Sequence, residues 1–214
     1  MNAVAEIPRV RVPRLWPGEP VVILGGGSSL TAEDVAFCRG KARVIAIKEA
    51  HQLAPWAEVL YAADAKWWRF YNGAPDFDGL KYSIEQSVDQ PPTDWSAWPD
   101  VRVLRNTGAD GLELDPSGLR TGYNSGYQAV NLAYHLAGPT RMILLGFDMW
   151  TGPRGEQNWF GAHPNHVPSP YPIFLQAFRG LARPLEAAGV RVLNASRFTV
   201  LDTFPRVALE EAFQ

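Results

Sequence analysis

The sequence predicts an α/β protein with a Rossmann-like, doubly wound and mainly parallel sheet, helices on both faces and long lid loops. Short apolar segments rich in valine, isoleucine and leucine alternate along the chain with segments whose apolar residues recur at helical spacing. A length of 214 residues suits one sizeable core. We therefore expect residues 1–214 to form a single domain.

The expected elements follow in chain order. Strands are predicted at residues 21–24, 43–48, 59–64, 101–105, 141–148 and 190–194. Helical segments are predicted at residues 31–39, 51–56, 66–70, 124–136, 173–188 and 209–213. The proline-containing residues 1–20 are expected to form an extended arm. Residues 71–99 and 110–121 are predicted to be irregular connections, and residues 149–172 a loop long enough to act as a lid.

The composition is typical of a globular protein, with 46% hydrophobic and 20% charged residues. A net charge of -2 predicts no general affinity for nucleic acid or for anionic membranes. The single cysteine, Cys38, cannot form an intrachain disulfide, and no Cys/His spacing indicates a zinc site. The sequence contains no apolar run of membrane-spanning length and no signal-peptide pattern, so we expect a cytoplasmic protein.

A turn of small residues directly follows the first predicted strand: Gly25, Gly26, Gly27, Ser28 and Ser29. Glycine allows positive φ and lets a ligand approach the backbone closely, and the first amides of the next helix point outward. Phosphate is the ligand expected at such a turn. A purely structural turn is the alternative, because Leu30 replaces the third glycine of the dinucleotide fingerprint and no Lys-Ser/Thr pair follows.

Polar residues also stand where other predicted strands end or where the next helix begins. They are Lys48, Glu49, Asp64, Asn124, Ser125, Gly126 and Asp148. Ligands of open parallel sheets bind beyond the carboxyl ends of the strands. We therefore predict a polar-ligand crevice at this edge, although strand ends also turn polar simply because they reach water.

The predicted lid loop contains two histidines and two tryptophans, namely His163, His166, Trp150 and Trp159. Imidazole is well suited to removing a proton from a hydroxyl group at neutral pH. His163 and His166 are therefore candidate general bases, with ordinary surface histidines as the alternative. Their spacing also fits a metal pair, but no third ligand is evident nearby, and no metal site is expected.

Three segments together carry a resemblance to a known family: residues 23–30, the Asn124-Ser125-Gly126 helix start and residues 143–148. Their order and approximate spacing resemble the bacterial sialyltransferase superfamily, typified by the Campylobacter lipooligosaccharide enzymes. They also resemble the related 6-hydroxymethylpterin pyrophosphokinase-like domains. Residues 64–68 and the helix start look like those of proteins carried by bacteriophages and prophages.

The resemblance implies a nucleotide-dependent transferase that moves a group from a nucleotide-activated donor to a hydroxyl acceptor. The nucleotide site would consist of Gly25, Gly26, Gly27, Ser28, Ser29, Asp64, Asn124, Ser125, Gly126 and Asp148. The catalytic residues would be His166, or else His163, as the base, with Lys48, Trp150 and Trp159 stabilising the departing phosphate. The two tryptophans fall about where the family has tyrosines, and Gly26 stands where it has an asparagine.

A sialyltransferase-like enzyme needs no metal and no further cofactor. A pyrophosphokinase-like transferase is the first alternative, and it would require ATP and magnesium. The second alternative is a non-catalytic nucleotide-binding protein of the phage type.

Overall fold

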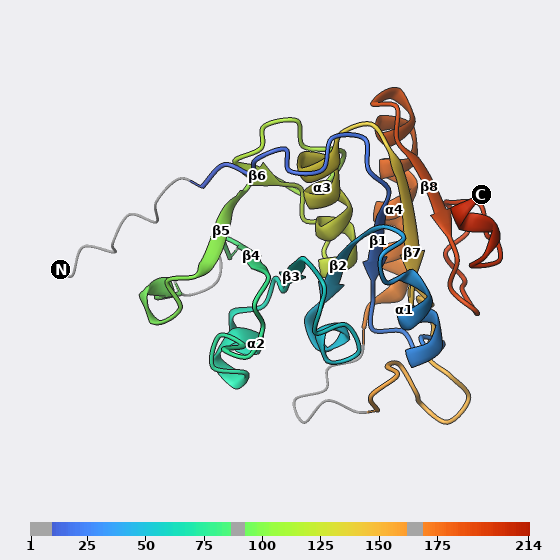
Figure 1. Cartoon of the computed structure of the whole chain (residues 1–214), viewed down its shortest axis with the longest axis horizontal. Coiled ribbons are helices and arrows are strands. Elements are labelled where there is room, and N and C mark those ends of the chain that lie inside the picture. Colours follow the sequence, from blue (N-terminus) through green and yellow to red (C-terminus); the bar gives the residue numbers. More distant parts are fainter. Residues whose placement is uncertain (1–9, 87–92, 162–168) are drawn as a thin grey trace.

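Within the part of the chain that the structure describes, the sheet has eight strands, and every neighbouring pair is parallel (Figure 1). This computed structural model describes residues 10–86, 93–161 and 169–214. The strands are β1 (Val21–Leu24), β2 (Arg43–Ile47), β3 (Val59–Tyr61), β4 (Leu80–Ile84), β5 (Val101–Asn106), β6 (Gly118–Leu119), β7 (Arg141–Leu145) and β8 (Arg191–Asn194). Their order is β6-β5-β4-β3-β2-β1-β7-β8, which confirms the predicted α/β fold with a parallel, doubly wound sheet.

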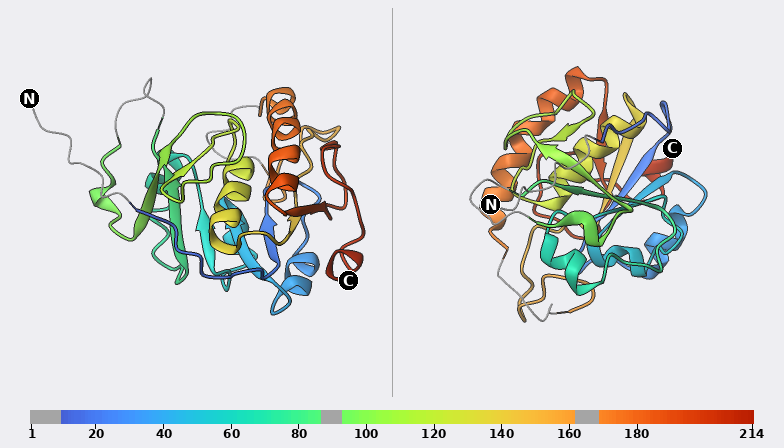
Figure 2. Two further views of the ribbon diagram at one scale, coloured as in Figure 1. Left: turned by 90° about the horizontal axis from the view of Figure 1, so that it is seen from above. Right: turned by 90° about the vertical axis from the view of Figure 1, so that its left-hand side faces the viewer.

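Helices cover both faces of the sheet, as Figure 2 shows. The α-helices are α1 (Ala32–Cys38), α2 (Ala65–Phe70), α3 (Ser125–Ala137) and α4 (Tyr171–Ala187), and the 3-10 helices are η1 (Lys48–Gln52), η2 (Trp95–Ala97) and η3 (Glu211–Phe213). In β1, Val21 and Ile23 pack into the core under α3 and α4, whereas Val22 and Leu24 pack into the core under α1 and α2. This alternation follows from the two-residue period of a strand.

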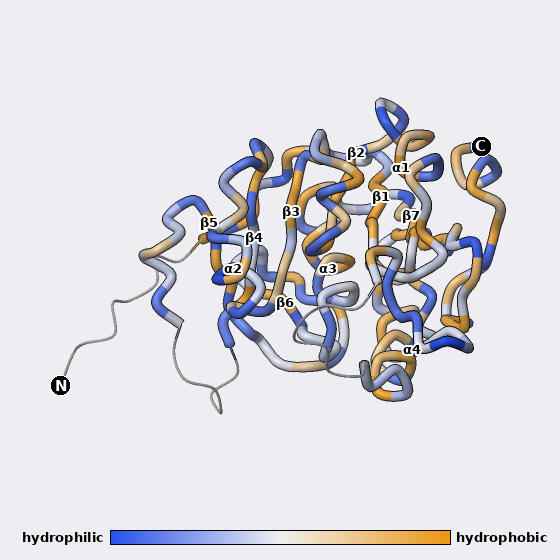
Figure 3. The backbone as a smooth tube through the Cα atoms, turned by 90° about the horizontal axis from the view of Figure 1, so that it is seen from below, coloured by the Kyte–Doolittle hydropathy of each residue, from blue (hydrophilic) through white to orange (hydrophobic). Residues whose placement is uncertain are grey.

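β1 (VVIL) and β7 (RMILL) are strongly hydrophobic strands (Figure 3). All four residues of β1 are fully buried, as expected for a central parallel strand covered on both faces. Within the described residues, no helix is both long enough and apolar enough to span a membrane.

Two strands lie in segments that the sequence pattern assigns to irregular connections. β4 lies within residues 71–99, and β6 lies within residues 110–121. The polar residues Lys81 and Ser83 interrupt the apolar character of β4, yet both are buried. Lys81 Nζ pairs with Asp100 at 2.5 Å, and Ser83 Oγ donates to the Ala62 carbonyl. Partners in the folded chain therefore allow a strand that hydrophobicity alone does not reveal.

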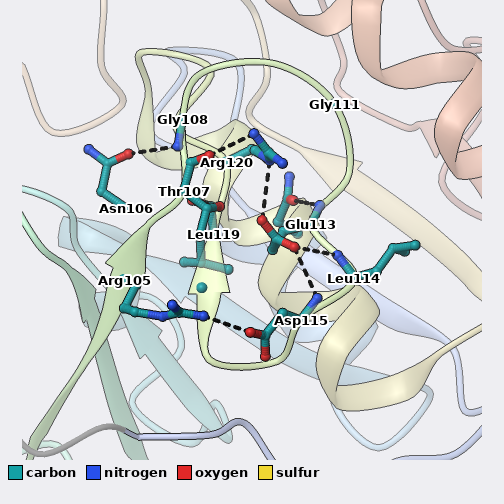
Figure 4. A network of polar contacts seen from close by, with 12 residues as sticks. Arg105, Asn106, Thr107, Gly108, Gly111, Glu113, Leu114, Asp115, Leu119 and Arg120 are labelled. Atoms are coloured by element: carbon teal, nitrogen blue, oxygen red, sulfur yellow. Dashed lines mark hydrogen bonds and ion pairs between the residues drawn. The ribbon is translucent and has the colours of Figure 1, made fainter.

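A network of polar contacts holds the connection from β5 to β6 at the sheet edge (Figure 4). Arg105 pairs with Asp115 at 2.6 Å, and Glu113 pairs with Arg120 at 3.2 Å. Glu113 also accepts hydrogen bonds from the Leu114 and Asp115 amides. These contacts satisfy the backbone of a connection that contains little apolar side chain.

The described part of the N-terminal arm is extended, as expected, and it packs against the domain. Val12 N donates to the Pro116 carbonyl at 2.8 Å, and Trp16 N donates to the Leu136 carbonyl at 2.9 Å. The Trp16 side chain is 5% exposed and belongs to the core under α3. The arm thus joins the β6 edge to the carboxyl end of α3.

We predict that Trp16→Ala lowers the free energy of unfolding by about 3–5 kcal/mol, because it removes a large buried side chain and leaves a cavity. The neighbouring variant Leu15→Ala is the control, since Leu15 is 46% exposed and should change stability by less than about 0.5 kcal/mol. Urea denaturation measures both. Equal losses of unfolding free energy in the two variants would contradict a specific contribution of Trp16 to the core.

Candidate functional site

The strand order places a topological switch point between β1 and β7. From β1 the chain builds β2 to β6 on one side, and then returns to place β7 and β8 on the other side. The turns after these two strands touch: Gly25 N donates to the Leu145 carbonyl at 2.7 Å, and Gly27 N donates to the Gly146 carbonyl at 2.8 Å. Switch points of open parallel sheets form the crevices in which ligands bind.

A pocket of about 140 Å³ lies at this position. Its walls come from the turn after β1, the segment after β7, the start of α3, the described part of the predicted lid loop and the start of α4. The lining residues are Gly25, Gly26, Gly27, Ile47, Asn124, Gly126, Gly146, Phe147, Asp148, Met149, Gln157, Asn158, Ser169, Tyr171 and Phe174. The structure thus brings together six residues of the predicted nucleotide set: the three glycines of the turn, Asn124, Gly126 and Asp148.

Hydrogen bonds from the turn after β1 hold the Asp148 side chain in the pocket wall. Asp148 is 2% exposed, and its carboxylate accepts hydrogen bonds from Ser29 N at 2.7 Å, Ser29 Oγ at 2.6 Å and Ser28 Oγ at 3.3 Å. Burial raises the pKa of Asp148 above its ordinary value, although the hydrogen bonds from Ser29 and Ser28 act in the opposite direction. The carboxylate therefore joins the turn after β1 to the end of β7.

This arrangement changes the role expected for the glycine turn. Ser28 and Ser29 do not line the pocket, because they bind Asp148 instead. A phosphate on the turn would lie beside this carboxylate, and two unit charges about 4 Å apart repel by about 4 kcal/mol at an effective dielectric constant of about 20. The expected phosphate cradle is therefore occupied by a carboxylate of the protein itself.

Close packing, rather than positive φ, explains two glycines of the turn, Gly25 and Gly27. None of the three glycines of the turn lies in the left-handed region. A Cβ on Gly25 would stand 2.5 Å from the Gly146 carbonyl oxygen, and a Cβ on Gly27 would collide with Asp148 Oδ1. The two turns approach each other so closely that there is no room for a side chain at Gly25 or Gly27, whereas a Cβ on Gly26 would fit.

The start of α3 forms the opposite wall of the pocket. Asn124 caps this helix, because its Oδ1 accepts from Tyr127 N at 2.8 Å and its Nδ2 donates to the Gly122 carbonyl at 2.8 Å. The amides of Ser125 and Gly126 precede the first donor of the intrahelical ladder. Gly126 lines the pocket and Ser125 does not.

The predicted residues at the ends of β2 and β3 lie outside the pocket lining. Lys48 Nζ pairs with Asp64 at 2.5 Å. Glu49 is buried and accepts from Trp67 Nε1 at 2.9 Å and from the Tyr71 hydroxyl at 3.3 Å. These contacts join η1 to α2, so the polar ends of these two strands support neighbouring helices.

The two tryptophans of the predicted lid loop take different positions. Trp150 is 42% exposed, and its ring lies 5.6 Å from the Phe198 ring. Trp159 N donates to the Gly26 carbonyl at 3.1 Å, and Trp159 Nε1 is buried without a hydrogen-bond partner among the described residues. Neither tryptophan lines the pocket.

His163 and His166 lie outside the described residues. The described lid loop contributes Asn158 and Ser169 to the pocket lining, one on each side of the two histidines in sequence. The predicted role of either histidine as the base stays a prediction.

Several pocket residues carry no recognisable signal in the sequence. Tyr171, in the first turn of α4, lines the pocket, and burial raises the pKa of its phenol while a hydrogen bond with Ser169 acts in the opposite direction. Met149, also in the lining, has a left-handed φ of 51° although it is not a glycine. Left-handed backbone at a non-glycine residue costs about 1–3 kcal/mol and concentrates at functional sites.

No family model and no curated protein matches this chain. A solved structure with weak similarity is the LpqC poly(3-hydroxybutyrate) depolymerase from Bordetella parapertussis. It is 14% identical, the match covers 88% of this chain and 76% of the depolymerase chain, and the TM-score is 0.20. Similarity at this level supports no conclusion about the pocket. Within the described residues, no group of three or more His, Cys, Asp or Glu side chains could hold a metal ion.

We predict that Gly27→Ala destabilises the protein by about 1–3 kcal/mol, because the new Cβ overlaps Asp148 and lies 2.6 Å from the Gly146 carbonyl oxygen. Gly26→Ala is the matched control: its Cβ would meet nothing closer than Asn158 Oδ1 at 3.4 Å, so stability should change by less than about 0.5 kcal/mol. Thermal or urea unfolding compares the two. The close packing of the turns is refuted if both variants behave alike.

The raised pKa of Asp148 predicts a pH dependence. The folded state binds the Asp148 proton more tightly than the unfolded state, in which the aspartate pKa lies near its ordinary value of 3.8. The contribution of Asp148 to stability therefore rises as the pH falls through the folded pKa toward 3.8. The unfolding free energy of wild type minus that of Asp148→Asn should increase as the pH falls through this window. Urea denaturation at several pH values measures this difference. A difference that stays constant or decreases there would contradict the prediction.

Proposed function

We propose that the protein is a nucleotide-dependent transferase, of the sialyltransferase-like glycosyltransferase type, that moves a group from a nucleotide-activated donor to a hydroxyl acceptor. One observation supports it above the others: the pocket at the switch point joins the turn after β1 to the start of α3 and to both described ends of the predicted lid loop. The three sequence segments that resemble the family, residues 23–30, 124–126 and 143–148, therefore all contribute to one small pocket.

In this proposal the nucleotide binds in the pocket, with its phosphate near the first amides of α3. Such amides, at the positive end of a helix of 13 residues, favour an anion. The Tyr171 phenol lies in the same lining and is a hydrogen-bond donor for the leaving phosphate. His166, or else His163, accepts the proton of the acceptor hydroxyl.

The proposal also includes a cytoplasmic protein that acts on a small molecule and has no general affinity for nucleic acid. A net charge of -2 supports the absence of a general affinity for nucleic acid. The resemblance of residues 64–68 to phage-encoded proteins suggests the same origin for this chain.

We predict that one member of a panel of CMP, UDP, GDP and ADP raises the melting temperature of the full chain. A ligand at about a hundredfold excess over its dissociation constant adds about 2.7 kcal/mol to the unfolding free energy. Differential scanning fluorimetry, with and without magnesium, measures the shift. If all four nucleotides fail at millimolar concentration, the proposal is wrong.

Donors that carry the nucleotide found to bind are then used in a turnover assay. The assay compares His166→Ala and His163→Ala as a matched pair. Loss of a general base lowers turnover by about 10²- to 10⁴-fold. We expect this loss in the His166 variant alone, with nucleotide binding unchanged. Strict dependence on ATP and magnesium would instead favour a pyrophosphokinase-like transferase. Nucleotide binding without turnover, unaffected by His166→Ala, would indicate a non-catalytic binding protein.

A further inference from the structure

The pocket lining has an unusual charge for a site expected to hold a nucleotide. Among its described lining residues, Asp148 is the only side chain with a formal charge at neutral pH, and no lysine, arginine or histidine is present. A diphosphate carries several negative charges and is normally held by cationic side chains or a metal ion. The innermost part of this pocket is therefore better suited to an uncharged part of a ligand.

Two of the described cations near the carboxyl edge of the sheet, Lys48 and Arg197, are already paired. Lys48 Nζ contacts Asp64 at 2.5 Å, and Arg197 Nε contacts Asp34 at 2.7 Å. Arg197 makes a second hydrogen bond to Asp34 at 3.0 Å. Recruiting either cation to a phosphate would require breaking its ion pair, and neither residue lines the pocket.

Asp148 retains capacity to accept a hydrogen bond. A carboxylate offers about four lone-pair sites, and Ser28 and Ser29 supply three donors. A ligand hydroxyl is the natural additional donor, since it satisfies the carboxylate without adding negative charge. The pocket also contains the aromatic residues Phe147 and Phe174 and the aliphatic Ile47, which suit the carbon face of a sugar ring.

The acidic residue at the position that usually binds ribose hydroxyls in a dinucleotide fold makes contacts within the protein instead. That acid follows the second strand of the fold. Here the corresponding Glu49 is buried against α2, where it accepts from Trp67 and Tyr71. Asp148 is the acid that both follows a central strand and lines the pocket.

We propose that Asp148 recognises the ribose hydroxyls of the ligand, and that the ribose, rather than a phosphate, lies against the glycine turn. Asp148 is then a specificity-determining residue that selects ribonucleosides over dideoxyribonucleosides and keeps phosphate away from Gly25, Gly26 and Gly27. The inference rests on the proposed nucleotide site and adds the orientation of the nucleotide within it.

The test measures binding to the full chain by isothermal titration calorimetry. The probes are the ribonucleoside, its 2′,3′-dideoxy counterpart and the 5′-monophosphate of cytosine, uracil, guanine and adenine. For the base that binds, we expect the dideoxynucleoside to bind at least tenfold more weakly than the ribonucleoside. Millimolar inorganic phosphate should leave the affinity for the ribonucleoside unchanged.

Two variants separate recognition by Asp148 from general effects. Asp148→Asn should reduce the discrimination against the dideoxynucleoside to less than threefold. Asp202→Asn is the control, because Asp202 is exposed, pairs with Arg179 and does not line the pocket, so full discrimination should remain. If Asp148→Asn fails to fold, the comparison of ligands on the wild-type protein still decides the question.

The outcomes distinguish this inference from the proposed function. Equal affinity for the two nucleosides, or competition by inorganic phosphate, would overturn the ribose orientation while nucleotide binding stands. Absence of binding for every nucleoside and nucleotide would overturn both.

Discussion

The contact between Asp148 and the turn after β1 is the constraint on which the rest of the site depends. Asp148 follows β7 and Ser29 follows β1. These adjacent strands mark the switch point, where the chain stops adding strands on one side of β1 and continues on the other. The carboxylate receives both the amide and the hydroxyl of Ser29, while Gly27 leaves the space that the carboxylate occupies. A carboxylate with so little contact with water is stable only when hydrogen bonds compensate for its lost hydration. The same contact therefore holds the turn after β1 against the segment after β7 and contributes the charge of the pocket lining.

The central strands could be predicted from the sequence because burial on both faces of a parallel sheet requires almost continuous apolar residues. β1, β2 and β7 meet this requirement, and their positions follow from hydrophobicity alone. β4 does not, since Lys81 is buried through a partner, Asp100, that lies in a different segment of the chain. β6 contributes only two residues and is specified by its pairing with β5 rather than by a pattern of its own.

Part of the site could also be predicted from the sequence. General rules for parallel sheets indicate which strand ends carry ligands, and this is enough to select the glycine turn, Asn124 and Asp148. They do not indicate whether a polar group at a strand end faces the ligand or the protein. Lys48 and Asp64 face each other, and Ser28 and Ser29 face Asp148. Tyr171 reaches the pocket only because α4 begins beside it, which depends on the path of a loop.

The N-terminal arm gives α3 a mechanical anchor far from the pocket. The amino end of α3 forms one wall of the pocket, and the carbonyls of Leu136 and Ala137 at its other end accept hydrogen bonds from the arm. α3 is a continuous helix of 13 residues between these two ends. The arm thus fixes the carboxyl end of the same helix whose amino end forms a pocket wall, so Trp16 supports that wall without lining the pocket itself.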